Sequence, residues 1–122
     1  MAATSDIILN DFGAVAKTFT PSVAVANGFQ YSDISSSIAS PRTLQVKHIV
    51  LPANAQSGTE VHSLSFAHTV PDSLGANRTV SVALVFRVPR TGPTLANRRD
   101  LWTFVKDFLT DANIEKLLIG GF

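Results

Sequence analysis

The sequence predicts an α+β fold in which an antiparallel β-sheet with an N-terminal hairpin precedes two C-terminal α-helices. Residues 5–90 are rich in Val, Ser, Thr, Phe and Ile, and Gly, Pro and Asn interrupt them at intervals. This composition is typical of antiparallel strands and their turns. After Pro89, Gly92 and Pro93 the apolar spacing changes from two residues to about 3.6 residues. Strands that come first and helices that come last define the α+β class.

Length and composition predict one domain that buries apolar surface against a partner. The chain has 122 residues, and nothing divides it into two foldable halves, so we expect a single domain over residues 1–122. Its residues are 45% hydrophobic and only 16% charged. So small a protein has a large surface for its volume and needs a polar exterior. We therefore expect part of the apolar surface to be covered by a second copy of the chain.

Several function classes are disfavoured at once. The chain has no cysteine, which excludes disulfides, thiolate metal sites and a catalytic cysteine. The N-terminus lacks a basic segment followed by an apolar stretch, and no apolar run approaches membrane-spanning length. We therefore expect a soluble, cytoplasmic protein with no membrane partner. The net charge of +1 is too small to predict nucleic-acid binding by itself.

The first elements are predicted to form a hairpin. Strands at 6–10 and 15–20 flank the turn at 11–14, where Gly13 is expected to take a positive φ angle. Pro21 is expected to end the second strand.

Four further strands follow, and their alternation predicts a sheet with one apolar and one polar face. They are expected at 29–35, 43–50, 61–70 and 79–88. The last is the clearest, because Val80, Val82, Leu84, Phe86 and Val88 alternate with more polar residues. Leu64 and Phe66 extend this apolar face. Such alternation fits an antiparallel sheet with one covered and one open face.

Two helices are predicted after the strands, at about 94–110 and 113–119. Thr94 or Asn97 can cap the first helix, and Gly120 with Gly121 ends the second. The first helix is amphipathic, and its apolar residues are the expected dimer interface: Leu101, Trp102, Phe104, Val105, Phe108 and Leu109.

The residues that carry chemistry do not indicate an enzyme. His48, His62 and His68 are spread over two strands, so a metal site needs two of them adjacent across a strand pair and a third ligand. We interpret all three as structural. No Ser lies in a nucleophile-elbow pattern, and no glycine loop of a common phosphate-binding pattern is present. We therefore expect no catalytic residue, no metal and no cofactor.

The polar sheet face is the most informative candidate site. Hydroxyls, an amide and two cations are predicted to share it, and strand-end cations at Arg42, Arg78 and Arg90 add charge. An ordinary solvated face is one interpretation. The other is RNA binding, in which cations contact phosphates and short polar side chains reach base edges or 2′-hydroxyls. The residues in question are Thr43, Gln45, Lys47, Ser63, Ser65, Ser81 and Arg87.

The ordered set of elements resembles the coat proteins of the small single-stranded RNA bacteriophages, the levivirus family. The features that carry the resemblance are the hairpin, Ala26-Asn27-Gly28, the strand running into Ile34-Ser35-Ser36-Ser37, three long strands, and two C-terminal helices. The similarity spans nearly the whole chain. It includes the strand from Thr79 to Val88-Pro89 and the helix with Arg98 to Thr110.

The resemblance implies a structural capsid protein rather than an enzyme. It implies an intertwined dimer with a continuous sheet, in which each chain's helices pack across the partner's sheet. Dimers of the family assemble into an icosahedral shell, with the open sheet face toward the genome. The segment from Val70 to Arg78 resembles the loop that gathers around the shell's symmetry axes, where Pro71, Gly75 and Asn77 allow more than one conformation.

The resemblance also implies that the polar face binds an RNA hairpin, which represses replicase translation and marks the genome for packaging. Thr43, Gln45 and Lys47 match the family's first RNA-facing strand. Ser81 and Ala83 depart from it, because better-known members place a base-stacking aromatic residue and an amide there. The implied location is the virion, and the host cytoplasm during assembly. A small dimeric RNA-binding regulator that forms no shell is the alternative, and a small Ser/His hydrolase is a third class.

Overall fold

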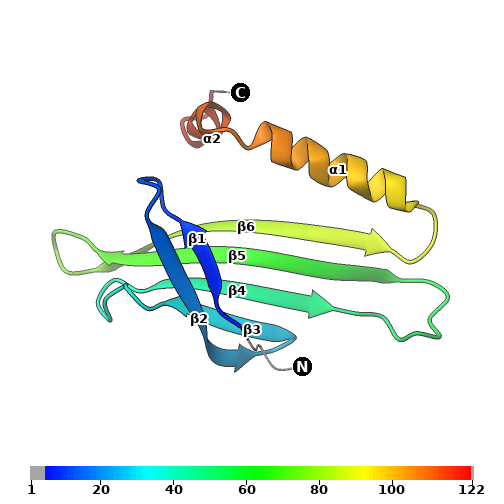
Figure 1. Ribbon diagram of the computed structural model, residues 1–122, viewed down its shortest axis with the longest axis horizontal. Coiled ribbons are helices and arrows are strands. Elements are labelled where there is room, and N and C mark those ends of the chain that lie inside the picture. Colours follow the sequence, from blue (N-terminus) through cyan, green and yellow to red (C-terminus); the bar gives the residue numbers. More distant parts are fainter. Residues whose placement is uncertain (1–4, 122) are drawn as a thin grey trace.

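The computed structural model describes residues 5–121, and it confirms the α+β class with a sheet followed by two helices (Figure 1). All neighbouring strands are antiparallel, in the sheet order β1-β2-β3-β4-β5-β6. The strands are β1 (Ile7–Asn10), β2 (Ala16–Val25), β3 (Gly28–Asp33), β4 (Arg42–Ile49), β5 (Thr59–Pro71) and β6 (Asn77–Pro89). The helices are α1 (Leu95–Phe108) and α2 (Asp111–Leu118).

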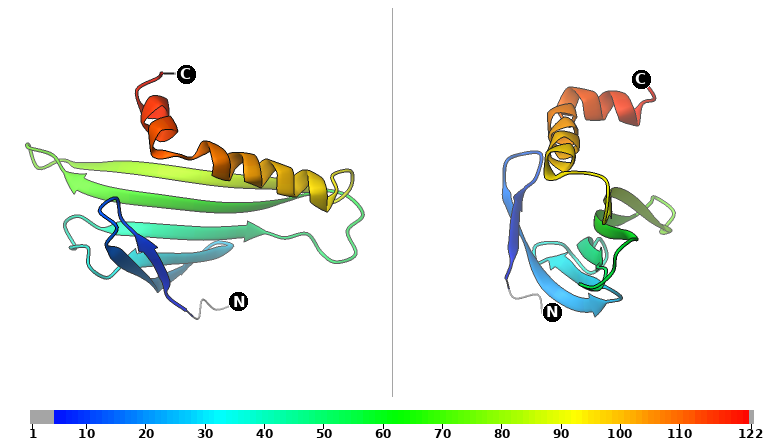
Figure 2. Two further views of the ribbon diagram at one scale, coloured as in Figure 1. Left: turned by 45° about the horizontal axis from the view of Figure 1, so that its top comes forward. Right: turned by 90° about the vertical axis from the view of Figure 1, so that its right-hand side faces the viewer.

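The sheet curls so that its first strands fold back over one face. Figure 2 shows the β1–β2 hairpin and α1 on the same side of the long strands β4, β5 and β6. A ring contact fixes this arrangement, because Phe19 of β2 meets Phe66 of β5 edge to face with 6.3 Å between ring centroids. The helix α1 runs beside β6, the last strand of the sheet (Figure 1).

The hairpin differs from the prediction in two details. The residue with a positive φ in its turn is Ala14, at 61°, and not Gly13. Asp11 stabilises that turn, because its Oδ1 accepts a hydrogen bond of 3.0 Å from the backbone N–H of Val15. Pro21 does not end β2, which continues to Val25. The pairing with β3 shifts between Pro21 and Val23, and such an irregularity accommodates a residue that has no N–H to donate.

A glycine permits the close approach of β3 to β4. Gly28 pairs with Lys47, and a Cβ atom on Gly28 would lie 1.8 Å from the backbone oxygen of Val46. No side chain can be accommodated at that distance without moving the strand. Gly28 therefore sets how the polar residues of β3 and β4 line up.

Side-chain caps define where both helices start. The Thr94 hydroxyl accepts a hydrogen bond from the Asn97 backbone N–H, and the Asn97 side chain accepts one from the Thr94 N–H. Thr110 caps α2 in the same way, by accepting from Asn113 N–H. Because Thr110 is a cap, α1 ends at Phe108 and α2 starts at Asp111, which differs by two residues from the predicted 110 and 113.

The single chain has almost no closed hydrophobic core. Among the described residues the only buried hydrophobic side chains are Phe19, 7% exposed, and Leu44, 1% exposed. Neither helix contains a buried residue. Burial of apolar surface is the main favourable contribution to the free energy of folding. A single chain in this arrangement gains little of that contribution, because most of its apolar side chains stay exposed.

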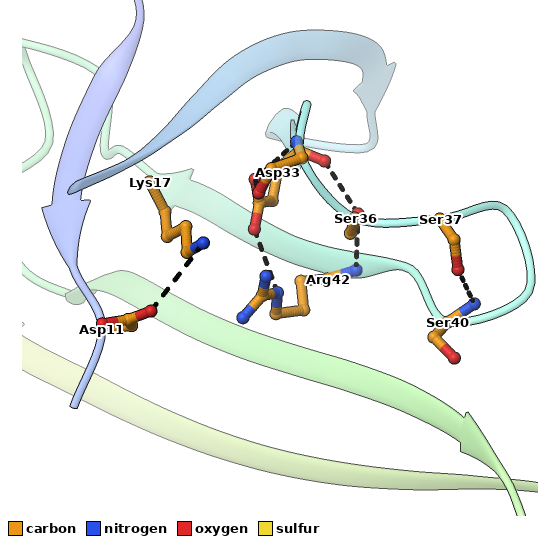
Figure 3. A network of polar contacts seen from close by, with 8 residues as sticks. Asp11, Lys17, Asp33, Ser36, Ser37, Ser40 and Arg42 are labelled. Carbon is orange, nitrogen blue, oxygen red and sulfur yellow. Dashed lines mark hydrogen bonds and ion pairs between the residues drawn. The ribbon is translucent and has the colours of Figure 1, made fainter. Parts of the chain in front are cut away.

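A polar network anchors the loop between β3 and β4 (Figure 3). Asp33 is 2% exposed, and its Oδ1 accepts hydrogen bonds from the Ser35 N–H and hydroxyl at 2.9 and 2.7 Å. Its Oδ2 lies 3.0 Å from Nε of Arg42. Burial raises the pKa of Asp33, but the hydrogen bonds from Ser35 and the charge of Arg42 outweigh it, so the pKa lies below its ordinary value. The ionised carboxylate therefore stabilises the folded loop.

We predict that Asp33→Asn lowers the free energy of unfolding by about 1–3 kcal/mol at fixed protein concentration, because it leaves Arg42 without its partner. The pKa of Asp33 is depressed by folding, so its contribution is present above the unfolded pKa of about 3.9 and is lost as the pH falls through the folded pKa. Urea unfolding at several pH values measures both effects.

Asp11→Asn is the matched control, because Asp11 pairs with Lys17 at 3.8 Å near the surface and should contribute less than about 1 kcal/mol. Equal destabilisation in the two variants, or an unchanged acid dependence in Asp33→Asn, would contradict this account of the loop.

Candidate functional site

The strand register brings six of the seven predicted RNA-contact residues into adjacent rows on one side of the sheet. Residues paired across antiparallel strands share a face. Thr43, Ala67 and Ser81 form one such row. The next two rows are Gln45, Ser65 and Ala83, then Lys47, Ser63 and Val85. We call the surface made by these rows, together with Arg87, the polar face.

Two cations lie toward one end of the polar face. Arg87 pairs with Val61, one row beyond the row of Lys47. Neither cation has an ion-pair partner within residues 5–121. Arg87 is exposed and Lys47 is half-buried. Both positive charges are therefore available to an anion on this face.

The three strand-end arginines do not add free charge, which corrects the prediction made for them. Arg42 pairs with Asp33, and Arg78 lies 3.2 Å from Asp72. Arg90 lies 3.5 Å from the carboxylate of Glu60, and it donates hydrogen bonds to three backbone oxygens of residues 52–55. Each guanidinium is compensated by a carboxylate. Asp72 lies in the turn that precedes Arg78, whereas Asp33 and Glu60 lie on other strands and meet Arg42 and Arg90 through the fold.

Sequence reasoning missed the part of the polar face that β3 supplies. Gln30 pairs with Gln45, and the Gln45 side-chain amide donates a 2.9 Å hydrogen bond to Oε1 of Gln30. Ser32 is the strand partner of Thr43. The face therefore extends across four strands. No local sequence signal indicated this contribution, because it depends on which residues of β3 and β4 pair with each other.

The opposite face of the sheet is apolar and only partly covered. The predicted apolar residues Leu64, Phe66, Val82 and Leu84 lie together there by register, since Phe66 pairs with Val82 and Leu64 pairs with Leu84. Val80 and Val82 are each 65% exposed. We call this surface the apolar face.

The predicted interface residues of α1 are also uncovered in one chain. Phe104 and Leu101 are each 65% exposed, and Val105 is the one half-buried member of the set. The others are exposed too: Trp102, Phe108 and Leu109. A single chain thus presents an apolar strand face and an apolar helix surface, and neither has a full cover.

The turn between β5 and β6 is shorter than the predicted loop. Pro71 and Asn77 pair with each other within the strands, so only residues 72–76 form the turn. Backbone hydrogen bonds from Leu74 and Ala76 to the Asp72 carboxylate lower its pKa below the ordinary value. Gly75 has a φ of 85°, which a glycine adopts without strain.

The histidines are not all alike. His48 and His62 are paired across β4 and β5, with 2.8 Å between their Nδ1 atoms, whereas His68 pairs with Arg42 and Val80. No group of three metal-binding side chains occurs in the described part of the chain. Among those residues there is also no helix long and apolar enough to cross a membrane.

Comparison with known proteins gives structural relatives only. No protein-family model matches the chain, and no curated protein sequence matches it. A virus-like particle of bacteriophage GQ-907 is similar, with a TM-score of 0.73, 19% identity, and coverage of 99% of this chain and 91% of that one. A virus-like particle of bacteriophage ESE058 has a TM-score of 0.71 and 19% identity over 94% of both chains. A virus-like particle of Wenzhou levi-like virus 1 has a TM-score of 0.58 and 20% identity, with coverage of 99% of this chain and 100% of that one.

These likenesses show the fold. The curled six-stranded antiparallel sheet with two C-terminal helices is the coat-protein fold of the levi-like bacteriophages, as the resemblance in sequence implies. The similar proteins are virus-like particles and a bacteriophage coat protein, all of them structural proteins rather than enzymes.

Proposed function

We propose that the chain is the coat subunit of a levi-like RNA bacteriophage, which dimerises, assembles into an icosahedral shell and resides in the virion. The observation that carries the proposal is a coat-protein fold whose apolar surfaces are left uncovered in a single copy. Coat subunits have no catalytic task, which agrees with the interpretation of the histidines and serines as structural. Assembly would take place in the host cytoplasm.

Dimerisation is the first step of this proposal. The strand β6 pairs only with β5 among the described strands, so its other edge, 13 residues long, offers unpaired backbone groups. A second copy that adds its own β6 would continue the sheet. Its α1 would then cover the apolar face around Val82, while Phe104 enters the partner's core. The sheet edge and the apolar surfaces would be satisfied by one symmetric contact.

RNA contact through the polar face is the second activity we propose. Lys47 and Arg87 supply uncompensated positive charge for phosphates, and the Gln and Ser side chains can bond bases or 2′-hydroxyls. The rows of this face contain no aromatic residue on which a base could stack. The proposed contact is therefore with genomic single-stranded RNA, and hairpin-mediated repression of replicase translation is not needed to explain these side chains.

Electron microscopy of the protein expressed alone tests the coat function, and we predict regular closed particles. Phe104→Asp should abolish them, because the carboxylate would be buried unpaired between subunits. Thr103→Asp is the matched control. Thr103 is about 100° from Phe104 around the helix axis and lies outside the apolar surface of α1, so particles should persist.

A stable dimer with no particles under any assembly condition would contradict the coat proposal and favour a small dimeric RNA-binding regulator. Soluble dimer from Phe104→Asp in wild-type yield would contradict the proposed interface.

We predict that Lys47→Ala and Arg87→Ala each reduce the RNA content of purified particles. Each should also reduce the salt dependence of RNA binding, with the slope of log K against log salt falling by about 0.7 for every phosphate that the variant no longer neutralises. Absorbance ratios of particles and filter binding with single-stranded RNA measure these effects. Arg99→Ala removes one positive charge from α1 instead, and it should leave the RNA content and the salt dependence of RNA binding unchanged. An unaltered RNA content in both β-strand variants would rule out the assigned face.

A further inference from the structure

The histidine pair on the apolar side of the sheet has the geometry of two metal ligands. His48 of β4 and His62 of β5 lie directly opposite each other, and their Nδ1 atoms are 2.8 Å apart. Their rings are inclined at 64°. Only one of these two nitrogens can carry the proton in a hydrogen bond between them, so the other presents a lone pair.

The two Nδ1 atoms are about as close together as two ligands of one metal ion. Two imidazole nitrogens that bind one ion at about 2.0 Å with a 90° angle are about 2.8 Å apart, whereas tetrahedral Zn²⁺ requires about 3.3 Å. The observed 2.8 Å is the length of the hydrogen bond between the two nitrogens, so it places them within reach of one ion but does not by itself select the metal. Binding of one ion by both nitrogens requires the two rings to rotate until their lone pairs point to a common position, which breaks the hydrogen bond between them.

Glu60 supplies the outer support that such a ligand needs. Its Oε1 lies 3.4 Å from Nε2 of His62, so its negative charge favours the tautomer that carries the proton on Nε2 and leaves Nδ1 free. The carboxylate is itself held in place, because its Oε2 accepts from the Leu51 N–H and pairs with Arg90. Histidine ligands of metals commonly have a carboxylate in this position.

From this arrangement we infer that His48 and His62 form a binding site for Cu²⁺, with water completing the coordination. The inference goes beyond the coat function and does not depend on it. Both imidazoles bind in the neutral form: each keeps one proton on Nε2, so the proton now shared between the Nδ1 atoms moves to Nε2 of His48. Cu²⁺ is favoured because it is the strongest binder among the divalent first-row ions and prefers tetragonal geometry.

The surroundings of the pair provide a reporter. A hollow of about 390 Å³ lies beside His62, and its walls include Glu60, Phe86, Arg98 and Trp102. Trp102 is the only tryptophan of the chain, so its fluorescence reports on this place alone. The guanidinium groups of Arg87 and Arg98 also line this hollow and oppose a bound cation, whereas the carboxylate of Glu60, which is shared with Arg90, attracts it.

Titration of the purified native protein with CuCl₂ tests the site, with Trp102 fluorescence and electron paramagnetic resonance as readouts. We expect one Cu²⁺ per chain, quenched fluorescence, and hyperfine structure from two imidazole nitrogens. His48→Ala and His62→Ala should each weaken binding at least about tenfold, and Glu60→Gln about tenfold. His68→Ala, the matched control, should bind as wild type does.

The site is refuted if His48→Ala and His62→Ala bind Cu²⁺ as tightly as wild type, or if His68→Ala loses as much affinity as they do. Absence of binding by the wild type would refute it equally. Particle formation or circular dichroism confirms that each variant is folded, so a loss of metal binding is not confused with a loss of structure or of the coat function.

Discussion

The lack of cover over one face of the sheet is the constraint on which the rest of the structure depends. Only Phe19 and Leu44 are buried apolar side chains in the described part of one chain, although nearly half of the sequence is hydrophobic. The N-terminal hairpin covers one region of the apolar face through the Phe19–Phe66 contact, and α1 lies beside β6 without closing the remainder. Exposed apolar area of this extent is unfavourable in water, so a second copy is the simplest source of the missing cover.

The same constraint assigns different contacts to the two faces of the sheet. If one face is committed to contacts between chains, the other is left for solvent or a ligand, and it carries hydroxyls, amides and two uncompensated cations among the small apolar residues Ala67, Ala83 and Val85. The strand-end cations Arg42, Arg78 and Arg90 are neutralised by Asp33, Asp72 and Glu60, so Lys47 and Arg87 are the cations of the described strands that have no ion-pair partner. One apolar face and one polar face are what the proposed shell around RNA would require of its subunit.

The sequence predicted the fold class, the approximate strand locations and the Thr94 cap of α1, because alternation, turn residues and capping residues are local signals. It was wrong where the outcome depends on tertiary contacts. Pro21 lies within β2 because a register shift accommodates it, and Ala14 rather than Gly13 takes the positive φ. The partners of Arg42 and Arg90, the contribution of Gln30 to the polar face, and the adjacency of His48 and His62 all follow from strand register, which no single-sequence pattern determines.

The most direct test of the central claim is how unfolding of the protein depends on its concentration, measured by urea denaturation with sedimentation velocity on the same samples. If folding and association are coupled, the unfolding midpoint rises with concentration and dilution yields unfolded chains rather than folded monomers. A folded monomer whose midpoint does not change with concentration would contradict the claim that one chain cannot complete its own core.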